Sequence, residues 1–180
     1  MNQIKVDQLT VQTFSNIFSG AMNRYGKLTY VDEVTGRKSC TEPKQPIPME
    51  QHLLQQEYLG RSPVNEDTKE ASWYGIDVDI KLNAKKFCSD IFNKIGSEYF
   101  CFQTFNKKWR VIKFLDKPID VEEAAIRAKD LEARVEKELN IKVDTGATTP
   151  TVPNEDKAVG RWLFLPYGKS YDVCFTPDRS

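Results

Sequence analysis

Strand-like and helix-like hydrophobic patterns alternate along the second half of the chain. Residues 73–80 (WYGIDVDI) are apolar with Asp at alternate positions, which is typical of a β-strand. Residues 99–104 and 109–115 are rich in aromatic and β-branched side chains, and the short polar link between them predicts a hairpin. Two later segments, 141–144 and 161–165, predict a short strand and a clear one.

Two amphipathic helices are predicted between these strands. Asn83 can cap the first helix, whose apolar residues share one face and which Gly96 ends. Asp120 and Glu123 form a capping-box pattern at the start of the second helix. The apolar stripe of this longer helix runs through Val121, Ala124, Ala128, Leu131, Val135 and Leu139.

The order of these elements predicts an α+β fold. Residues 73–165 give strand, helix, strand, strand, helix and strand, which is the split βαβ arrangement of ferredoxin-like domains. Helices cover one face of such a sheet, and we expect the other face to be free for ligands. RNA-recognition modules and polymerase palms share this architecture, so the site residues must decide between functions.

The first part of the chain predicts a smaller α/β extension. Residues 8–19 predict a short helix, and the polar, glycine- and proline-punctuated stretch 21–47 predicts a hairpin followed by a loop. A second helix is expected to begin at Pro48 and to end at Gly60. We therefore expect this extension to pack on the core as one structural appendage.

Length and composition fit one globular domain with such an appendage. The chain has 180 residues, which we divide into an N-terminal segment, 1–71, and a catalytic core, 72–180. We expect the core to have been cut from a longer protein. Lys and Arg (26) balance Asp and Glu (26), so a nucleic-acid partner would have to be recognised by local patches.

The cysteines and the hydropathy of the chain indicate a cytoplasmic protein. Four cysteines are scattered without a CxxC pair, which supports neither a zinc site nor a disulfide framework. The sequence shows no secretory signal and no long apolar run, so we expect reduced thiols and no contact with a membrane.

Two carboxylates on the first predicted strand form the strongest candidate site. Side chains two apart on a strand point to one face, so Asp77 and Asp79 project together, away from Ile76 and Val78. Two like charges roughly 7 Å apart need a cation between them, and oxygen ligands suit Mg²⁺ or Mn²⁺. Two such ions stabilise the attacking and leaving oxygens of phosphoryl transfer. The simpler interpretation is a pair of solvent-facing acids on an amphipathic strand.

A two-metal site needs a third acid, and Asp144 is the best candidate. It follows the apolar Ile141 and Val143 at the end of a short predicted strand, although a turn-forming Asp would fit the same pattern. Asp156 is the competitor, but it lies in a polar stretch that reads as a loop.

Basic residues at two places are candidates for phosphate binding: Lys108, Arg110, Arg161 and Lys169. Basic side chains beside Trp109 suit a triphosphate or a nucleic-acid backbone, although solvated lysines around a buried Trp are the commoner case. Alternation places Arg110 and Lys113 on opposite faces, so only one of them can reach the site.

The Gly-Lys-Ser triplet is not predicted to be a P-loop, and the single histidine is not predicted to be catalytic. The Gly-Lys-Ser triplet at 168–170 lacks the upstream glycine and the following helix of a P-loop. His52 is the single histidine of the sequence and falls in a predicted helix. We expect it to be a helix-surface or cap residue rather than a catalytic one.

These segments resemble the archaeo-eukaryotic primase (AEP) superfamily, in particular the primase-polymerases of phages, plasmids and other mobile elements. The stretch around Asp77 and Asp79 is similar to the first motif of the family, whose acids hold the catalytic metals. Val143-Asp144 looks like the third motif, an apolar residue followed by Asp. Residues 160–167 resemble the Gly-x-x-x-x-Leu-Pro stretch that follows in related members.

One position departs from the family pattern. The second motif normally ends in a histidine that contacts the phosphates of the incoming nucleotide, and here Trp109-Arg110 occupies that place. Arg110 can supply the contact, because guanidinium suits phosphate oxygens and stays charged. The resemblance implies synthesis of a primer or DNA strand on a single-stranded DNA template from nucleoside triphosphates, often beside a helicase.

Four rival functions have to be compared on the same residues. An RNA-recognition module would match the basic and aromatic run 108–114, but the run lacks the glycine of that motif. Two carboxylates on its binding face would also repel phosphate. A rolling-circle nicking enzyme needs a histidine cluster, and a palm-type cyclase needs a Gly-Gly-acid turn; the sequence has neither. A nucleic-acid-binding module, either a catalytically degenerate primase domain or an RNA-recognition-like domain, stays open as the alternative.

Overall fold

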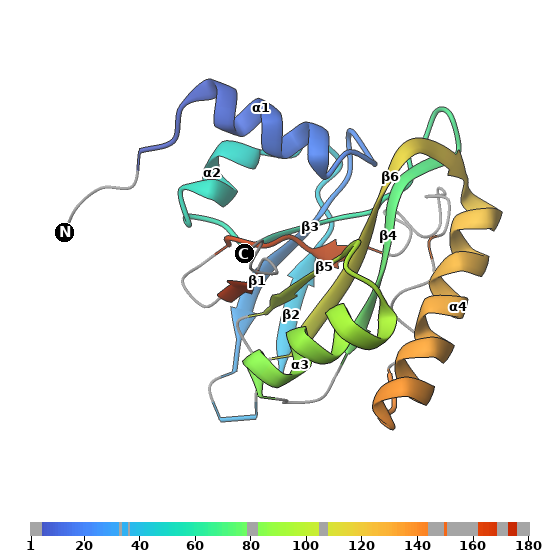
Figure 1. The fold of residues 1–180 in the computed structure, drawn as a ribbon. Coiled ribbons are helices and arrows are strands. Elements are labelled where there is room, and N and C mark those ends of the chain that lie inside the picture. Colours follow the sequence, from blue (N-terminus) through green and yellow to red (C-terminus); the bar gives the residue numbers. More distant parts are fainter. Residues whose placement is uncertain are drawn as a thin grey trace.

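Two antiparallel sheets organise the chain (Figure 1). The structure is a computed structural model that describes residues 5–32, 34–35, 37–78, 83–104, 108–143, 150, 162–168 and 173–175. Within these ranges the larger sheet has the strand order β4-β6-β5-β8 and the smaller sheet β2-β1-β3-β7. Helices and antiparallel sheets together confirm the predicted α+β class.

The larger sheet contains the strands predicted around the candidate site. Its members are β4 (Glu70–Val78), β5 (Tyr99–Gln103), β6 (Trp109–Asp120) and β8 (Val173–Phe175). The hairpin predicted from 99–104 and 109–115 is confirmed, and β6 extends to Asp120, which pairs with Glu70. In the strand order, β6 lies between β4 and β5.

The two predicted helices of this region are confirmed together with their caps. α3 (Ala84–Asp90) continues into a π-helical turn, η1 (Ile91–Ile95), and α4 spans Val121–Leu139. The Asn83 side chain accepts a hydrogen bond from the backbone N–H of Lys86 at 3.1 Å, and Asp120 accepts one from that of Glu122 at 2.7 Å. Both caps satisfy backbone donors that a helix leaves free in its first turn.

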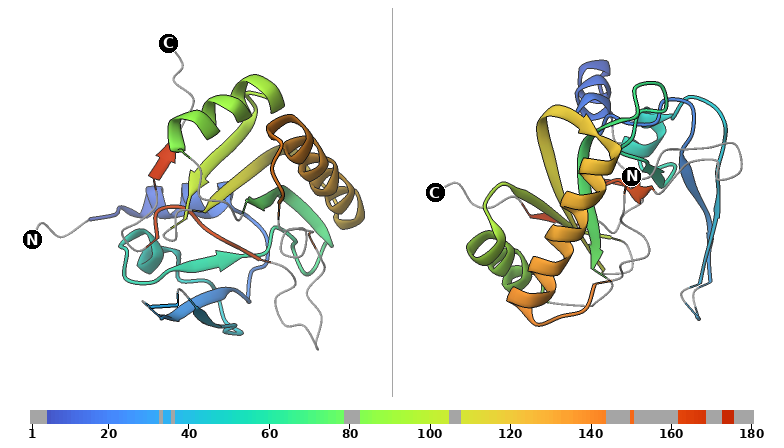
Figure 2. Two further views of the ribbon diagram at one scale, coloured as in Figure 1. Left: turned by 90° about the horizontal axis from the view of Figure 1, so that it is seen from below. Right: turned by 90° about the vertical axis from the view of Figure 1, so that its right-hand side faces the viewer.

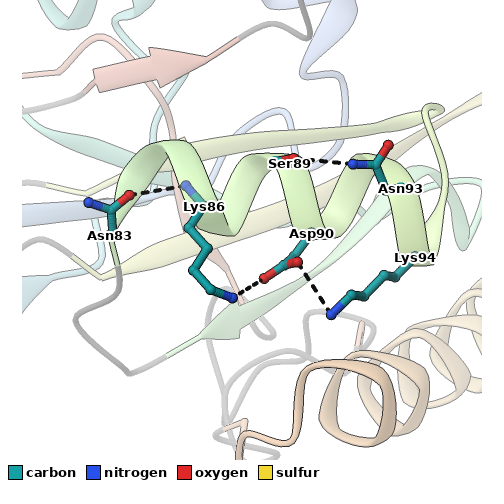
Figure 3. Close-up of polar contacts among 6 residues, drawn as sticks. All are labelled: Asn83, Lys86, Ser89, Asp90, Asn93 and Lys94. Carbon is teal, nitrogen blue, oxygen red and sulfur yellow. Dashed lines mark hydrogen bonds and ion pairs between the residues drawn. The ribbon is translucent and has the colours of Figure 1, made fainter.

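The outer surface of α3 is held by local ion pairs (Figure 3). Asp90 lies one turn from Lys86 and one turn from Lys94, and its carboxylate binds both ammonium groups, at 2.7 and 3.3 Å. Exposed pairs at this helical spacing each contribute only about 0.3–0.5 kcal/mol. The helix therefore depends for its stability on the apolar face that it turns to the sheet.

One face of the larger sheet packs against α3, η1 and α4 (Figure 2). Ile76 and Val78 of β4 are fully buried there, as the alternation of the sequence predicted. They pack with side chains from the helices: Phe87, Ile91, Ile95, Ala128, Leu131 and Val135. This cluster is the core of the part of the chain that carries Asp77.

The opposite face of the larger sheet is covered as well. Trp73, Phe102 and Ile112 of three adjacent strands are fully buried against residues from both ends of the chain: Phe14, Phe18, Met49, Leu163 and Leu165. The expectation that this face would be free for ligands is therefore wrong along most of its length. The covering residues lie far away in sequence, so alternation within the strands could not reveal them.

The smaller sheet and two short helices form this cover. They are α1 (Gln8–Ile17), β1 (Gly26–Val31), β2 (Lys38–Thr41), α2 (Met49–Leu53), β3 (Leu59–Arg61) and β7 (Leu163–Phe164). The hairpin predicted within 21–47 is confirmed as β1 and β2.

The second predicted helix of the N-terminal region is much shorter than expected. α2 ends at Leu53, Gln55 adopts a left-handed conformation with φ of 59°, and the chain turns back into β3. Gly60, expected to end the helix, lies inside this strand and pairs with Gly26. Pairing with β1 therefore overrides the helical periodicity of this segment.

The strand predicted at 161–165 forms in a different sheet from the one expected. Its described part, β7, pairs with β3 through Gly60↔Phe164 and Arg61↔Leu163. Residues 141–143, expected to begin a short strand, have no regular structure. In the part of the chain that the structure describes, the sheet of β4, β6 and β5 thus lacks the predicted 161–165 strand, and β8 pairs with β5 at its edge.

Two smaller observations concern the cysteines and the helices. Cys40, Cys88 and Cys101 are free cysteines in the structure, the first exposed and the last buried. Among the described residues, no helix combines the length and the apolar character needed to cross a bilayer.

A buried arginine joins α1 to the smaller sheet. Arg61 of β3 is 3% exposed, and its guanidinium donates hydrogen bonds at 2.8 to 3.3 Å to the carbonyl groups of Ser15, Phe18, Gly20 and Ala21. Burial lowers the pKa of Arg61 to about 10, so the group stays charged at neutral pH. It therefore satisfies the carbonyls that α1 and the following turn leave without helical partners.

We expect Arg61→Met to destabilise the protein strongly. Each buried carbonyl left without a donor costs about 1–3 kcal/mol, so the loss should be at least about 3 kcal/mol. Urea unfolding followed by circular dichroism measures it. The control is Arg127→Met, which removes a half-exposed arginine paired one turn away with Glu123 and should cost no more than about 0.5 kcal/mol. Equal losses for the two variants would contradict this role of Arg61.

Candidate functional site

Asp77 and Arg110 face each other on adjacent strands, the edge strand β4 and the central strand β6. Asp77 stands opposite Arg110 in the register of β4 and β6, and Nη1 of Arg110 donates to Oδ1 of Asp77 in an ion pair. The side chain of Asp77 is 14% exposed and that of Arg110 is 5% exposed. The structure thus brings a predicted metal ligand and a predicted phosphate ligand into direct contact.

The neighbours of this pair are apolar. Phe102 of β5 lies opposite Arg110 on its other side, and Ile112 is the next residue of β6 on the same face. Gly75 lies opposite Ile112, and a Cβ there would stand 2.7 Å from the backbone oxygen of Val111, so only glycine fits without displacement. Water is therefore kept from one side of the pair, and charges interact more strongly there than in bulk solvent.

The ambiguity between Arg110 and Lys113 is resolved in favour of Arg110. Lys113 points to the helix side of the sheet, where its ammonium group lies 5.8 Å from the centre of the Tyr99 ring. Arg110 is on the face of Asp77, as β alternation requires. Lys108 is described through its backbone, whose carbonyl accepts hydrogen bonds from the N–H and hydroxyl groups of Thr104.

Several predicted site residues lie outside the described residues: Asp79, Asp144, Asp156, Arg161 and Lys169. Among the residues that are described, no group of three or more His, Cys, Asp or Glu side chains is close enough to hold a metal ion. Asp77 itself suits a cation, because it is partly buried, is an oxygen donor and already binds the positive charge of Arg110.

The sequence analysis missed the role of His52. This residue is fully buried rather than at the surface of α2, which corrects the expectation of a surface or cap position. Its Nδ1 accepts a hydrogen bond from the backbone N–H of Leu59 at 3.2 Å, and its Nε2 donates to the carbonyl of Pro166 at 2.8 Å. The two partners fix the neutral tautomer with the proton on Nε2. The only feature of the sequence that drew attention to this residue is that it is the single histidine.

His52 and Tyr58 shape the segment that follows β7. Tyr58 stacks on Phe164 with ring centres 4.5 Å apart, and a Cβ on Gly168 would stand 1.8 Å from the Tyr58 ring. Tyr167 adopts a left-handed conformation with φ of 66°. The Leu-Pro-Tyr-Gly stretch, which resembles a family motif, is therefore a tight turn fixed against α2 and β3.

Comparison with known proteins gives a structural likeness only. No protein-family profile matches the sequence, and no curated protein matches it. Among solved structures, the chain is similar to the AEP domain of the primase-polymerase (PrimPol) of cyanophage S-2L. The TM-score is 0.55 and the sequence identity 10%, over 94% of this chain and 89% of that chain. At this identity the likeness shows a fold similar to an AEP domain.

We expect the stability of the protein to fall between pH 7 and pH 5 because of His52. Burial lowers the pKa of His52 to about 4, whereas the unfolded chain titrates near the ordinary value of 6.5. In this window the unfolded state binds a proton that the native state does not, so acid favours unfolding, by about 2 kcal/mol at pH 5.

Urea unfolding at several pH values measures this effect. In His52→Asn the total stability should be lower at pH 7, but the slope between pH 7 and pH 5 should nearly vanish, because the sequence has no other histidine. An unchanged slope in the variant would show that other groups cause the pH dependence.

Proposed function

We propose that this chain is the catalytic domain of a DNA primase-polymerase, which transfers nucleotides from nucleoside triphosphates to a strand paired with a single-stranded DNA template. The observation that carries the proposal is the facing pair of Asp77 and Arg110 on the adjacent strands β4 and β6 of an AEP-like fold. A metal ligand and a phosphate ligand must lie side by side in any enzyme that binds a metal–triphosphate complex.

The three described strands of the split unit support a palm-type site. β4, β6 and β5 lie in the order of the first, third and second strands of a split βαβ unit, with α3 and α4 on one face. Asp77 belongs to the first of these strands and projects away from the helices. This is the strand on which a palm-type site needs its carboxylates, and the side chain of Asp77 is 14% exposed there.

The proposed roles of the residues follow from their charge. Asp77, with Asp79 and Asp144, holds Mg²⁺ or Mn²⁺, and the bound ions supply charge stabilisation to the attacking and leaving oxygens. Arg110 binds triphosphate oxygens in place of the usual histidine, with Lys108, Arg161 and Lys169 as further basic ligands. Phe102 and Ile112 restrict water beside the pair. These residues act mainly by positioning and by charge compensation.

A nucleic-acid-binding domain without catalysis is the second candidate, and one observation favours it. Arg110 neutralises Asp77, so this carboxylate does not present an uncompensated negative charge to a phosphate backbone. In either case a helicase domain or partner would supply the single-stranded template.

We expect Asp77→Asn to abolish nucleotide incorporation, with a loss on the order of 100-fold or more, because a metal contributes several kcal/mol to the transition state. Incorporation is measured on single-stranded DNA with and without a primer, in Mg²⁺ and in Mn²⁺. The matched control is Asp116→Asn, an exposed acid on β6 of the same sheet, which should retain activity.

The unprimed reaction separates a primase from a polymerase that needs a primer. Activity that survives Asp77→Asn would show that the site is elsewhere. A folded wild-type chain that binds single-stranded DNA but incorporates no nucleotide in either metal would favour the second candidate.

A further inference from the structure

Asp77 and Arg110 cannot bind each other and their proposed ligands at the same time. This competition points to a coupling between the binding of the cation and the binding of the triphosphate. In the structure each side chain compensates the charge of the other. In the proposed function, Asp77 binds a divalent cation and Arg110 binds the phosphates of the nucleotide. We infer that the ion pair is an exchange contact, in which cation and triphosphate each replace one partner, so that the two ligands bind cooperatively. This inference rests on the proposed function.

The burial of the Asp77 and Arg110 side chains favours an exchange of both partners together. Arg110 is 5% exposed and Asp77 is 14% exposed, and the apolar Phe102 and Ile112 lie beside them. A buried charge that loses its partner is strongly unfavourable, and arginine cannot relieve the loss by releasing its proton. Separating the pair therefore costs less free energy when a new ligand compensates each of the two charges.

The guanidinium of Arg110 keeps one buried donor unused. Nη1 carries the hydrogen bond to Asp77 and a longer one, of 3.4 Å, to the carbonyl of Trp109. Nε of Arg110 is buried and has no hydrogen-bond partner among the described residues. Donor capacity is thus left over at the site, and a phosphate group is an acceptor that can use it in a bidentate contact.

The exchange predicts that each ligand binds more weakly alone than in the presence of the other. A divalent cation alone must displace Arg110 and leave it beside the metal, where like charges repel. A triphosphate alone must approach while Asp77 is left without its cation. A cation and a triphosphate together supply both missing charges, so each should tighten the binding of the other by the same factor.

The experiment measures each ligand alone, on variants that remove one member of the pair. Mn²⁺ binding is measured by calorimetry without nucleotide, and dATP binding in EDTA without metal, on the full chain. We expect Arg110→Gln to tighten Mn²⁺ binding and Asp77→Asn to tighten metal-free dATP binding, each by roughly tenfold or more. Each substitution thus increases the affinity for the ligand that binds the remaining member of the pair.

Two control variants separate exchange from a general effect of charge. Lys113→Gln removes the same charge from the same strand on the opposite face, where the lysine lies beside Tyr99, and should change Mn²⁺ affinity little. Arg110→Lys keeps a positive charge beside Asp77 and should change Mn²⁺ affinity less than Arg110→Gln does. Thermal unfolding shows which variants fold; if Arg110→Gln does not, the Asp77→Asn measurement with dATP still tests the inference.

Failure of the inference and failure of the proposed function look different. Mn²⁺ that binds the wild type, is lost in Asp77→Asn and is not tightened in Arg110→Gln would overturn the exchange and leave the proposed function standing. Equal tightening by Lys113→Gln would also overturn the exchange. Absence of Mn²⁺ and dATP binding in the wild type and in both variants would overturn the proposed function together with the exchange.

Discussion

The central strand β6 is buried on both faces over its first four residues, and the alternation of side chains there constrains the rest of the fold. Trp109 and Val111 point into the cluster under the helices, whereas Arg110 and Ile112 point toward the N-terminal cover. A slip of one residue would exchange the two sets and place a guanidinium among the helix contacts. The neighbouring strands must match this alternation, so the pairing of Asp77 with Arg110 follows from the packing of both cores.

This arrangement places a pair of opposite charges at the border of an apolar cluster. An isolated carboxylate there would be disfavoured by desolvation, and so would an isolated guanidinium. In the fold without ligands, the ion pair offsets the cost of removing both charges from water. The same burial that restricts them also strengthens whatever interaction replaces their contact.

Local features of the fold could be predicted from the sequence, and contacts between distant segments could not. Period-two alternation placed Ile76 and Val78 under the helices, and Asn83 and Asp120 were recognised as caps, because these signals depend on neighbouring residues alone. The facing of Asp77 and Arg110 needed the register of β4 and β6, which the sequence does not state. The burial of His52, the carbonyl contacts of Arg61 and the place of β7 depend on segments more distant still.

The pairing of β3 with β7 has a consequence for synthesis of the protein. The two strands lie about 100 residues apart in the sequence, and β7 supplies one edge of the sheet built by the N-terminal region. At translation rates of about 5–20 residues per second, β3 waits roughly 5–20 s before its partner is made. During this time β1, β2 and β3 present an unfinished edge, which can pair with other nascent chains. Slow folding and a need for chaperones on the ribosome are the expected costs of joining both ends of the chain in one sheet.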